Sequence, residues 1–411
     1  MEDISGNLDL SQYGGRIGTG TEHMIVCLVD RIKGLLDRHS DKSSVIASFL
    51  DWMSAFDRQD PTIAIEKFIK LGVRASLIPL LISYLSNRKM QVKFNGETSE
   101  FLSLIGGGPQ GTLLGQLEYL VLSNDNADCV TDEDRYKYID DLTLLELVCL
   151  SGLLTEYNYM EHVPSDIGVG KNYLPAENFQ TQDNLNYIAS WSELNKVKLN
   201  ETKCKYMIFT RSQEDFSTRL RINNHTIDKI QAYKLLGIWI TEDLSWEFNT
   251  KEMCRKAYSR IAMLTKLKYI GTSTDDLIEI YILFIRSLTE YCAVTFHSSL
   301  TVSQTADIER IQKTCLKIIL GDNFVSYPAA LEMTGLDSLY TRREKRCLNF
   351  SLKALKHPVH SRLFPTNRNQ NNESTNVRNR EKFHVNFART ECYRKSAIPY
   401  CQRLLNEHFN K

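Results

Sequence analysis

Two adjacent aspartates interrupt an apolar stretch, and no other feature restricts the local structure of this chain as strongly. Asp140 and Asp141 follow an aromatic run that begins at Tyr136 and precede an apolar run that ends at Val148. Alternation and aromatic or β-branched content predict two short strands, with the aspartates at or beside a tight turn. Adjacent carboxylates repel each other, so burial requires a neutralising partner, for which a divalent cation such as Mg²⁺ is the obvious candidate. A solvated turn is the alternative, because Asp is a common turn residue.

A third carboxylate directly follows a predicted buried strand. The apolar run 45–50 has the length and composition of such a strand, and it ends at Asp51. Pro61 then predicts the start of a helix. A carboxylate at the end of a buried strand can take part in chemistry, and it can equally cap a helix, so this segment alone leaves both interpretations open.

A glycine-rich loop lies between these carboxylates, at residues 106–112 (GGGPQGT). Three glycines let the backbone approach a ligand closely, and Gln110 offers both a donor and an acceptor. A plain loop that enters a helix at Thr112 is the alternative, and it is favoured when this segment is considered alone. Just before the loop, Asn95-Gly96 predicts a hairpin turn.

The composition is that of an ordinary globular chain of two or three domains, with an uneven charge distribution. The 411 residues carry 50 basic and 50 acidic side chains, but residues 338–411 hold 16 Lys and Arg against 5 Asp and Glu, a local net charge of +11. This asymmetry predicts a basic tail that could contact phosphates.

Cysteine usage and hydropathy predict an intracellular protein, in the nucleus or the cytoplasm and not secreted. The ten cysteines are scattered without zinc-type spacing, which is typical of reduced thiols. The polar, acidic N-terminus is unlike a signal peptide, and no apolar run approaches the ~20 residues that a membrane span needs. We therefore expect no membrane partner.

Periodicity predicts the remaining elements. Helices are predicted at 21–35, at 62–70 and at 75–86, the last being apolar and assigned to the core. Another helix is predicted to be capped near Thr181. Three amphipathic helices between 253 and 318 predict a separate helical subdomain. Strands are predicted at 206–210, in a hairpin that turns at Asn223-Asn224, and over 233–241 as a single strand. Residues 1–21 predict a loop rather than a core element, and residues 366–382 a mobile basic linker.

In this order, the segments resemble the reverse transcriptases of non-LTR (LINE, jockey-type) retrotransposons. The matching pieces are FLDWMSAFD at 49–57, GPQGTLLG at 108–115, YIDD at 138–141, LNETKC at 199–204 and LLGI at 235–238. Residues 12–15 (QYGG) with 21–23 (TEH) are similar to the family's late fingers segment, and residues 388–406 resemble the ending of such reading frames. The resemblance covers nearly the whole chain.

The resemblance implies an α+β fold: a polymerase palm, made of an antiparallel sheet with flanking helices, together with partial fingers and an α-helical thumb and C-terminal region. The implied domains are residual fingers at 1–43, a palm with a catalytic hairpin and a primer-grip-like hairpin at 44–245, a helical thumb at 246–335, and a basic C-terminal extension at 336–411.

The implied activity is that of an RNA-directed DNA polymerase, with an RNA template, a DNA primer and deoxynucleoside triphosphates as partners. Asp51, Asp140 and Asp141 would hold two Mg²⁺ ions (Mn²⁺ is possible) ~4 Å apart, which activate the primer 3′-hydroxyl and stabilise the leaving group. The resemblance assigns four further functions: Lys203 protonates or neutralises the leaving pyrophosphate, Phe56 excludes a 2′-hydroxyl, Gln110 and Gly111 lie against the incoming nucleotide, and Leu235, Leu236 and Gly237 grip the primer. From the residues alone, Phe56 could equally be core and Lys203 a solvated surface lysine.

The sequence also departs from the family pattern. Most of the fingers expected before Gln12 is absent, so we expect an N-terminally truncated fragment. Gln116 stands where the family usually has Pro, and the run from Gly111 to Asp140 is short. The alternative function is therefore a catalytically inactive, nucleic-acid-binding remnant of such a polymerase.

Overall fold

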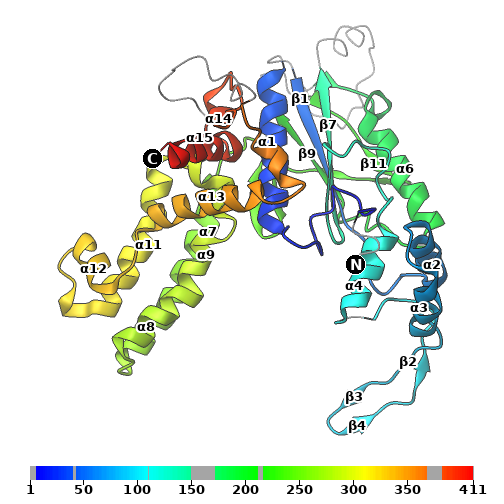
Figure 1. Cartoon of the computed structure of the whole chain (residues 1–411), viewed down its shortest axis with the longest axis horizontal. Coiled ribbons are helices and arrows are strands. Elements are labelled where there is room, and N and C mark those ends of the chain that lie inside the picture. The colour runs from blue at the N-terminus through cyan, green and yellow to red at the C-terminus, as the bar shows by residue number, and fades with distance from the viewer. Residues whose placement is uncertain are drawn as a thin grey trace. The chain divides into compact units, whose positions relative to one another are not determined.

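The computed structural model describes residues 6–39, 43–109, 111–149, 172–211, 216–367 and 382–410 (Figure 1). The chain divides into two compact units. The first contains residues 1–24 and 39–230, and the second contains residues 25–38 and 231–411. Most of the predicted linker at 366–382 lies outside the described residues.

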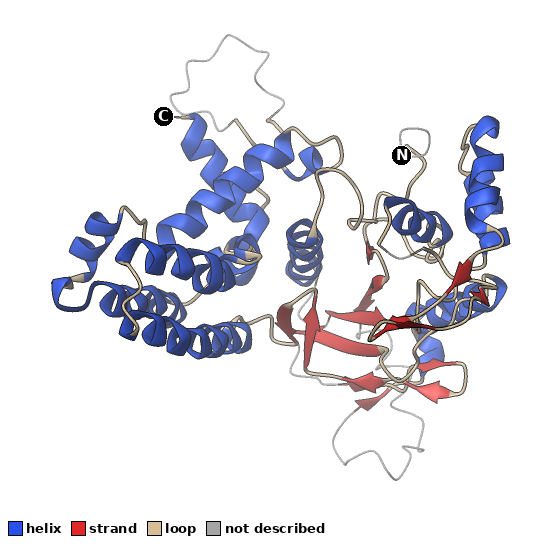
Figure 2. Ribbon diagram, turned by 90° about the horizontal axis from the view of Figure 1, so that it is seen from below, coloured by secondary structure: helices blue, strands red, loops and turns tan. Residues whose placement is uncertain are grey.

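A five-stranded sheet forms the centre of the first unit, in the order β13-β9-β1-β7-β6 (Figure 2). Its members are β1 (Ser43–Leu50), β6 (Arg135–Tyr138), β7 (Asp141–Cys149), β9 (Lys205–Thr210) and β13 (Asp228–Lys229). β1 pairs antiparallel with both β7 and β9, and all eight of its residues are buried. A continuous apolar run is expected for such a central strand, so the strands predicted at 45–50 and 206–210 are confirmed.

Helices flank this sheet within the same unit. They are α2 (Pro61–Lys70), the 3₁₀ turn η1 (Ala75–Leu77), α3 (Ile78–Leu85), α4 (Leu113–Leu122), the 3₁₀ turn η2 (Ala176–Asn178) and α6 (Gln180–Leu194). Thr112 caps α4, as the sequence predicts. The start of α6 at Gln180 agrees with the cap predicted near Thr181, but the capping group comes from another element: the carboxylate of Glu146 on β7 accepts the N–H groups of Gln180 and Thr181.

A slender hairpin projects from this unit beyond α3 (Figure 1). It consists of β2 (Lys89–Met90), β3 (Lys93–Phe94), β4 (Glu97–Thr98) and β5 (Leu102–Ser103). Asn95 and Gly96 both have positive φ, 49° and 88°, which confirms the predicted two-residue turn. The assignment of residues 75–86 to the core is only half right: Leu81 and Leu85 are buried, whereas Leu80 and Ile82 are exposed.

Three further short pairs complete the strands. They are β8 (Asn172–Tyr173) with β10 (Phe216–Ser217), β11 (Arg221–Ile222) with β12 (His225–Thr226), and, in the second unit, β14 (Ala232–Leu235) with β15 (Ile238–Thr241). The single strand predicted over 233–241 is wrong. Leu236 and Gly237 have φ of 46° and 90°, so the chain reverses there in a tight turn.

Apart from the β14–β15 pair, the second unit is mainly helical in its described part. Its helices are most of α1 (Thr21–Arg38), α7 (Glu247–Tyr269), α8 (Thr274–Ile280), η3 (Tyr281–Arg286), α9 (Ser287–Glu290), α10 (Ala293–Phe296), η4 (His297–Ser299), α11 (Val302–Leu320), η5 (Gly321–Asn323), α12 (Tyr327–Thr334), α13 (Leu339–Leu355), η6 (His360–Leu363), α14 (Glu391–Arg394) and α15 (Ala397–Phe409). The predicted helical subdomain is confirmed, since Leu264, Leu277 and Ile311 share one apolar core.

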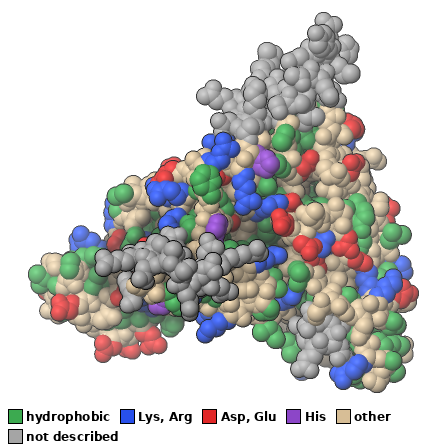
Figure 3. Space-filling model, turned by 45° about the horizontal axis from the view of Figure 1, so that its top comes forward, with side chains coloured by type: hydrophobic (Ala, Val, Ile, Leu, Met, Phe, Trp, Pro, Cys, Tyr) green, Lys and Arg blue, Asp and Glu red, His purple; other side chains and the backbone are tan. Residues whose placement is uncertain are grey.

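The surface carries charges of both signs. Figure 3 shows basic and acidic side chains interspersed with apolar ones over the face in view, in agreement with the formal net charge of zero. None of the helices that the structure describes has the length and apolar character needed to span a bilayer. All ten cysteines lie among the described residues, and none of them forms a disulfide bond.

Candidate active site

The two adjacent aspartates lie at a tight turn between β6 and β7. Tyr138 pairs with Asp141, so Ile139 and Asp140 are the two residues of the turn. In the neighbouring strand pair, Leu50 lies opposite Leu142. Asp51, the residue after Leu50, is therefore brought beside the strand that starts at Asp141. Sheet register thus brings Asp51 beside the adjacent carboxylates of Asp140 and Asp141, which lie about ninety residues later in the sequence.

These carboxylates act on one another electrostatically. Burial, together with the charges of Asp140 and Asp51, raises the pKa of Asp141 to about 6. Burial and the charge of Asp51 likewise raise the pKa of Asp140. The phenol of Tyr119 lies in the field of all three, and burial followed by these charges raises its pKa well above the usual value. The three aspartates therefore form a single negative cluster.

The cluster has the chemistry of a cation site. The Oδ2 atom of Asp51 is buried and accepts no hydrogen bond from the described residues. A bound cation would offset the burial and the repulsion that raise the pKa values of Asp140 and Asp141, and carboxylate oxygens suit Mg²⁺. Within the described part of the chain, however, no three His, Cys, Asp or Glu side chains form a ready-made metal-binding group. Charge and donor type therefore fit a divalent cation, without a preassembled set of ligands.

One basic side chain reaches this cluster. The Nζ atom of Lys203 lies 3.6 Å from Oδ2 of Asp51, and its side chain is 69 % exposed. Lys203 follows a turn in which the N–H of Asn200 donates to the backbone oxygen of Asp51, 2.8 Å away. The backbone therefore ties the segment that carries Lys203 to the end of β1.

A pocket opens beside the Asp140 turn. It has a volume of about 470 Å³ and is lined by Phe56, Pro109, Gly111, Thr112, Leu113, Gly115, Gln116 and Ile139. Two predicted nucleotide-binding residues, Phe56 and Gly111, thus line one cavity with the residue that precedes Asp140. The Phe56 ring also packs on Tyr119, with centroids 5.1 Å apart. The third predicted nucleotide-binding residue, Gln110, lies outside the described residues.

Buried polar side chains lie under the glycine-rich loop, and the sequence did not predict them. Neither carboxylate oxygen of Glu118 nor either side-chain polar atom of Gln59 has a hydrogen-bond partner among the described residues. Burial raises the pKa of Glu118 to about 7, although the charge of Arg88 partly lowers it. The only sequence signal is one glutamate inside the apolar helix LLGQLEYLVL, at 113–122.

The N-terminal segment also reaches the β6–β7 hairpin, so the prediction of a loop outside the core is wrong for residues 8 and 11–13. Leu8, Ser11, Gln12 and Tyr13 are all buried. The segment pairs with β6 through the N–H of Lys137, which donates to the oxygen of Ser11, and the N–H of Tyr13, which donates to the oxygen of Lys137. Ser11 and Tyr13 can be buried because β6 pairs with their backbone groups.

The predicted primer-grip residues lie in the second unit. Leu235 is buried at the end of β14, while Leu236 and Gly237 form the turn to β15. Tyr291 directly follows α9, and its hydroxyl donates a hydrogen bond to the backbone oxygen of Leu236 over 2.7 Å. This bond fixes the turn to the end of α9. A pocket of about 400 Å³ adjoins this hairpin. Its charged lining residues are Lys234, Lys256, Arg260 and Glu252.

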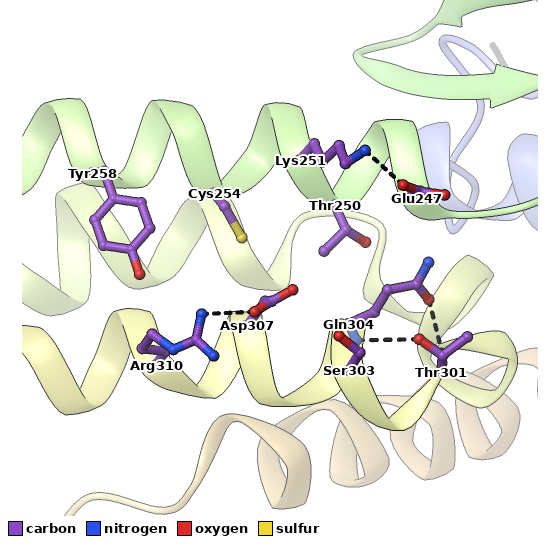
Figure 4. Close-up of a pocket in the computed structure, with 10 residues that line it drawn as sticks. All are labelled: Glu247, Thr250, Lys251, Cys254, Tyr258, Thr301, Ser303, Gln304, Asp307 and Arg310. Atoms are coloured by element: carbon purple, nitrogen blue, oxygen red, sulfur yellow. Dashed lines mark hydrogen bonds and ion pairs between the residues drawn. The ribbon is translucent and has the colours of Figure 1, made fainter.

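Another pocket in the second unit holds none of the predicted site residues. It has a volume of about 540 Å³ and lies between α7 and α11 (Figure 4). Its charged side chains pair with one another: Lys251 lies 2.5 Å from Glu247, and Arg310 lies 2.8 Å from Asp307. Because these charges cancel locally, the pocket offers no net charge to a phosphate or to a metal ion.

Comparison with solved structures gave weak matches. A telomerase from Candida tropicalis, solved with a fragment of telomeric RNA, aligns over 86 % of this chain and 46 % of its own, with 11 % identity and a TM-score of 0.40. The corresponding telomerase from Candida albicans covers 86 % of this chain and 54 % of its own, with 11 % identity and a TM-score of 0.38. TM-scores below 0.5 are too low to support an argument about fold or function.

Sequence comparison is more informative, although no protein-family model matches the chain. The RNA-directed DNA polymerase from mobile element jockey of Drosophila melanogaster is 24 % identical over 268 residues, 65 % of this chain and 27 % of that protein. The probable RNA-directed DNA polymerase from transposon BS of the same species is 26 % identical over 261 residues, 62 % of this chain and 26 % of that protein. The chain spans about a quarter of the length of these relatives. As the order of its motifs predicts, this chain is therefore similar in sequence to the RNA-directed DNA polymerases of jockey and other Drosophila transposons.

Proposed function

We propose that this chain is the reverse transcriptase part of a mobile-element protein and that it extends a DNA primer on an RNA template. The observation that carries the proposal is the convergence of Asp51, Asp140 and Asp141 beside a pocket lined by Phe56 and Gly111. Sequence similarity to polymerases of the jockey type supports the reaction class. In this interpretation the sheet of the first unit, which is antiparallel except for the parallel pair of β13 with β9, is a polymerase palm, and the helices of the second unit include the thumb.

The carboxylate cluster would hold the metal ions. Two Mg²⁺ ions, or Mn²⁺ in their place, would lower the pKa of the primer 3′-hydroxyl and stabilise the charge on the attacking and leaving oxygens. Asp51 would contribute from the end of β1, and Asp140 and Asp141 from the hairpin turn. The features that favour this assignment are the buried Oδ2 of Asp51, which accepts no hydrogen bond from the described residues, and the mutual repulsion within the cluster.

The neighbouring side chains would bind and orient the substrates. Lys203, which lies beside Asp51, would protonate or neutralise the leaving pyrophosphate. Phe56 would pack under the sugar and exclude a 2′-hydroxyl, and Gln110 and Gly111 would lie against the incoming nucleotide. The Leu236–Gly237 turn, with the basic lining of the adjoining pocket, would contact primer phosphates, which fix position without reading sequence.

A second candidate is a nucleic-acid-binding protein that keeps this fold without catalysing extension. The observation that favours it is that the described residues form no ready-made metal-binding group. Both candidates predict that the protein binds an RNA template with the same affinity, but only the first predicts that it extends a primer.

Primer extension distinguishes them. With purified protein, an RNA template, a DNA primer and Mg²⁺, we expect extension by the unmodified chain and by Asp275→Asn, which changes an exposed carboxylate on α8. Asp140→Asn is expected to lose extension and to keep template binding in a gel-shift assay, because it removes one negative charge from the cluster. If the unmodified protein and Asp140→Asn both bind template and both fail to extend, the non-catalytic candidate is correct.

A further inference from the structure

The turn that presents the two adjacent aspartates has a strained backbone. Ile139, its first residue, has a φ of 57°. A β-branched side chain is a genuine outlier there, since Gly, Asn and Asp are the residues that normally take positive φ in two-residue turns. Such a conformation persists only when the surrounding structure determines it.

One buried side chain, that of Gln12, holds the backbone of the turn in this conformation. The Oε1 atom of Gln12 accepts a hydrogen bond from the N–H of Ile139 at 2.9 Å and another from the N–H of Gly14 at 2.9 Å. Gln12 is only 4 % exposed. A single carbonyl oxygen thus ties the N-terminal segment to the turn, across 127 residues of sequence.

The segment approaches the turn so closely that only glycine fits beside it. A Cβ atom on Gly14 would lie 2.6 Å from Cγ1 of Ile139 and 2.7 Å from its backbone nitrogen. On the other side, a Cβ atom on Gly15 would lie 2.7 Å from Leu120 of α4. Residues 14 and 15 therefore fill the space between the turn and α4, which carries Gln116 on the wall of the nucleotide pocket.

Ion pairs anchor the same N-terminal segment to β6, two and four residues before Ile139. The Nζ atom of Lys137 lies 2.6 Å from Asp9, and both side chains are 2 % exposed. Arg135 pairs with Asp9 over 3.1 Å. Because β6 carries both cations and leads directly into the turn, Gln12 is held in fixed register with Ile139.

We infer that Gln12 is a positioning residue for the carboxylate cluster. Its side-chain carbonyl fixes the backbone of Ile139, and this sets the position of Asp140 and Asp141 together with the Ile139 wall of the pocket. The inference rests on the proposed polymerase function for its catalytic consequence, but its structural part can be measured without activity.

The test compares three substitutions. Gln12→Met keeps the length of the side chain and removes the acceptor, and Gln12→Glu keeps the acceptor. Gln182→Met is the matched control, because Gln182 also makes two hydrogen bonds to backbone, with the N–H and the oxygen of Arg221. Two readouts are needed: amide hydrogen exchange at Ile139 and Gly14, and steady-state extension with the concentration of Mg²⁺ and of nucleotide varied.

In Gln12→Met we expect exchange at Ile139 to rise about tenfold, as for the loss of one buried hydrogen bond. Exchange in β1 and the melting temperature should change no more than in Gln182→Met. The kcat should fall by about tenfold to a hundredfold, which a small misplacement of reacting groups can cause, and the half-saturating Mg²⁺ concentration should rise. Gln12→Glu should restore the protection of Ile139.

Unchanged exchange at Ile139 in Gln12→Met would overturn the inference, as would an equal rise throughout the first unit. If the unmodified protein extends no primer, the proposed function fails, while the exchange measurement still decides whether Gln12 holds the turn.

Discussion

At the scale of single residues, the burial of Glu118 without a hydrogen-bond partner among the described residues shifts the pKa of its carboxyl group. Glu118 is fully buried under the glycine-rich loop, and its carboxylate has no hydrogen-bond partner among the described residues. Burial raises its pKa from 4.5 to about 7. The folded chain therefore holds this proton over a pH range in which the unfolded chain has already released it.

This shift predicts a specific pH dependence of stability. Between pH 4.5 and 7 the folded state binds more protons than the unfolded state, so the contribution of Glu118 is full below pH 4.5 and is lost as pH rises through 7. The total loss is about 3 kcal/mol, at 1.36 kcal/mol for each unit of pKa. Glu118→Gln should therefore be about as stable as the unmodified protein at pH 5 and more stable at pH 8, as measured by urea unfolding at both values. Glu193→Gln, an exposed position on α6, should follow the unmodified protein. The same difference in stability between Glu118→Gln and the unmodified protein at pH 5 and at pH 8 would contradict the prediction.

At the scale of secondary-structure elements, β1 and the projecting hairpin differ most clearly in how far their side chains are exposed to solvent. Phe49 on β1 is 1 % exposed, whereas Phe94 on β3 is 75 % exposed. Phe49→Ala should lower the free energy of unfolding by about 3–5 kcal/mol, because it leaves a cavity in the core. Phe94→Ala should change it by less than about 0.5 kcal/mol, as for other exposed positions. Denaturant titration of both variants measures the difference, and equal losses would show that the hairpin packs on the body in solution.

The sequence predicted the elements whose signal is local. The apolar run of β1, the Asn95-Gly96 turn and the periodic helices of the second unit all carry their information within a few residues. The local pattern predicts a single strand through Leu236 and Gly237, because Leu236 adopts a positive φ inside a strand-like run, whereas the family resemblance implies a hairpin there. The start of α6 is predicted within one residue, but its capping group is not, because Glu146 lies 34 and 35 residues before the two amides that donate to it.

In the candidate site, too, the residues with a local sequence signal were predicted and those without one were not. Asp51, Asp140 and Asp141 were found from strand ends and turns, and the sheet register brings them together. Gln12 and Glu118 were missed, because their surroundings are made by residues distant in sequence. Gln12 gains its importance from Ile139, 127 residues away, and no local pattern encodes that contact.

At the scale of the whole molecule, the chain does not divide into units at a single point. Residues 25–38 of α1 belong to the second unit, although most of the residues before position 230 form the first. Val26 packs in one core with Val294 and Ile398. The carboxylate of Asp37 accepts the backbone N–H groups of Arg389 and Thr390. The second unit therefore has a helix of the N-terminal part of the chain in its core.

This arrangement predicts the behaviour of fragments. Residues 231–411 expressed alone should aggregate or melt without cooperativity, because the apolar partners of α1 are left exposed. The same fragment joined through a flexible linker to residues 21–38 should melt cooperatively, as followed by circular dichroism and gel filtration. Asp37→Ala in the joined fragment should lower its melting temperature. A shorter fragment that is as stable as the joined one would refute this dependence on α1.

The place of α1 in the second unit has a consequence for synthesis on the ribosome. Asp37 and its partner Arg389 are 352 residues apart, so at about 5–20 residues per second the helix is made roughly 20–70 s before its partner exists. During that interval the apolar face that carries Val26 has no native cover. A nascent chain of this kind needs either a chaperone or a temporary non-native contact, and the speed of translation becomes a variable in how much of it folds.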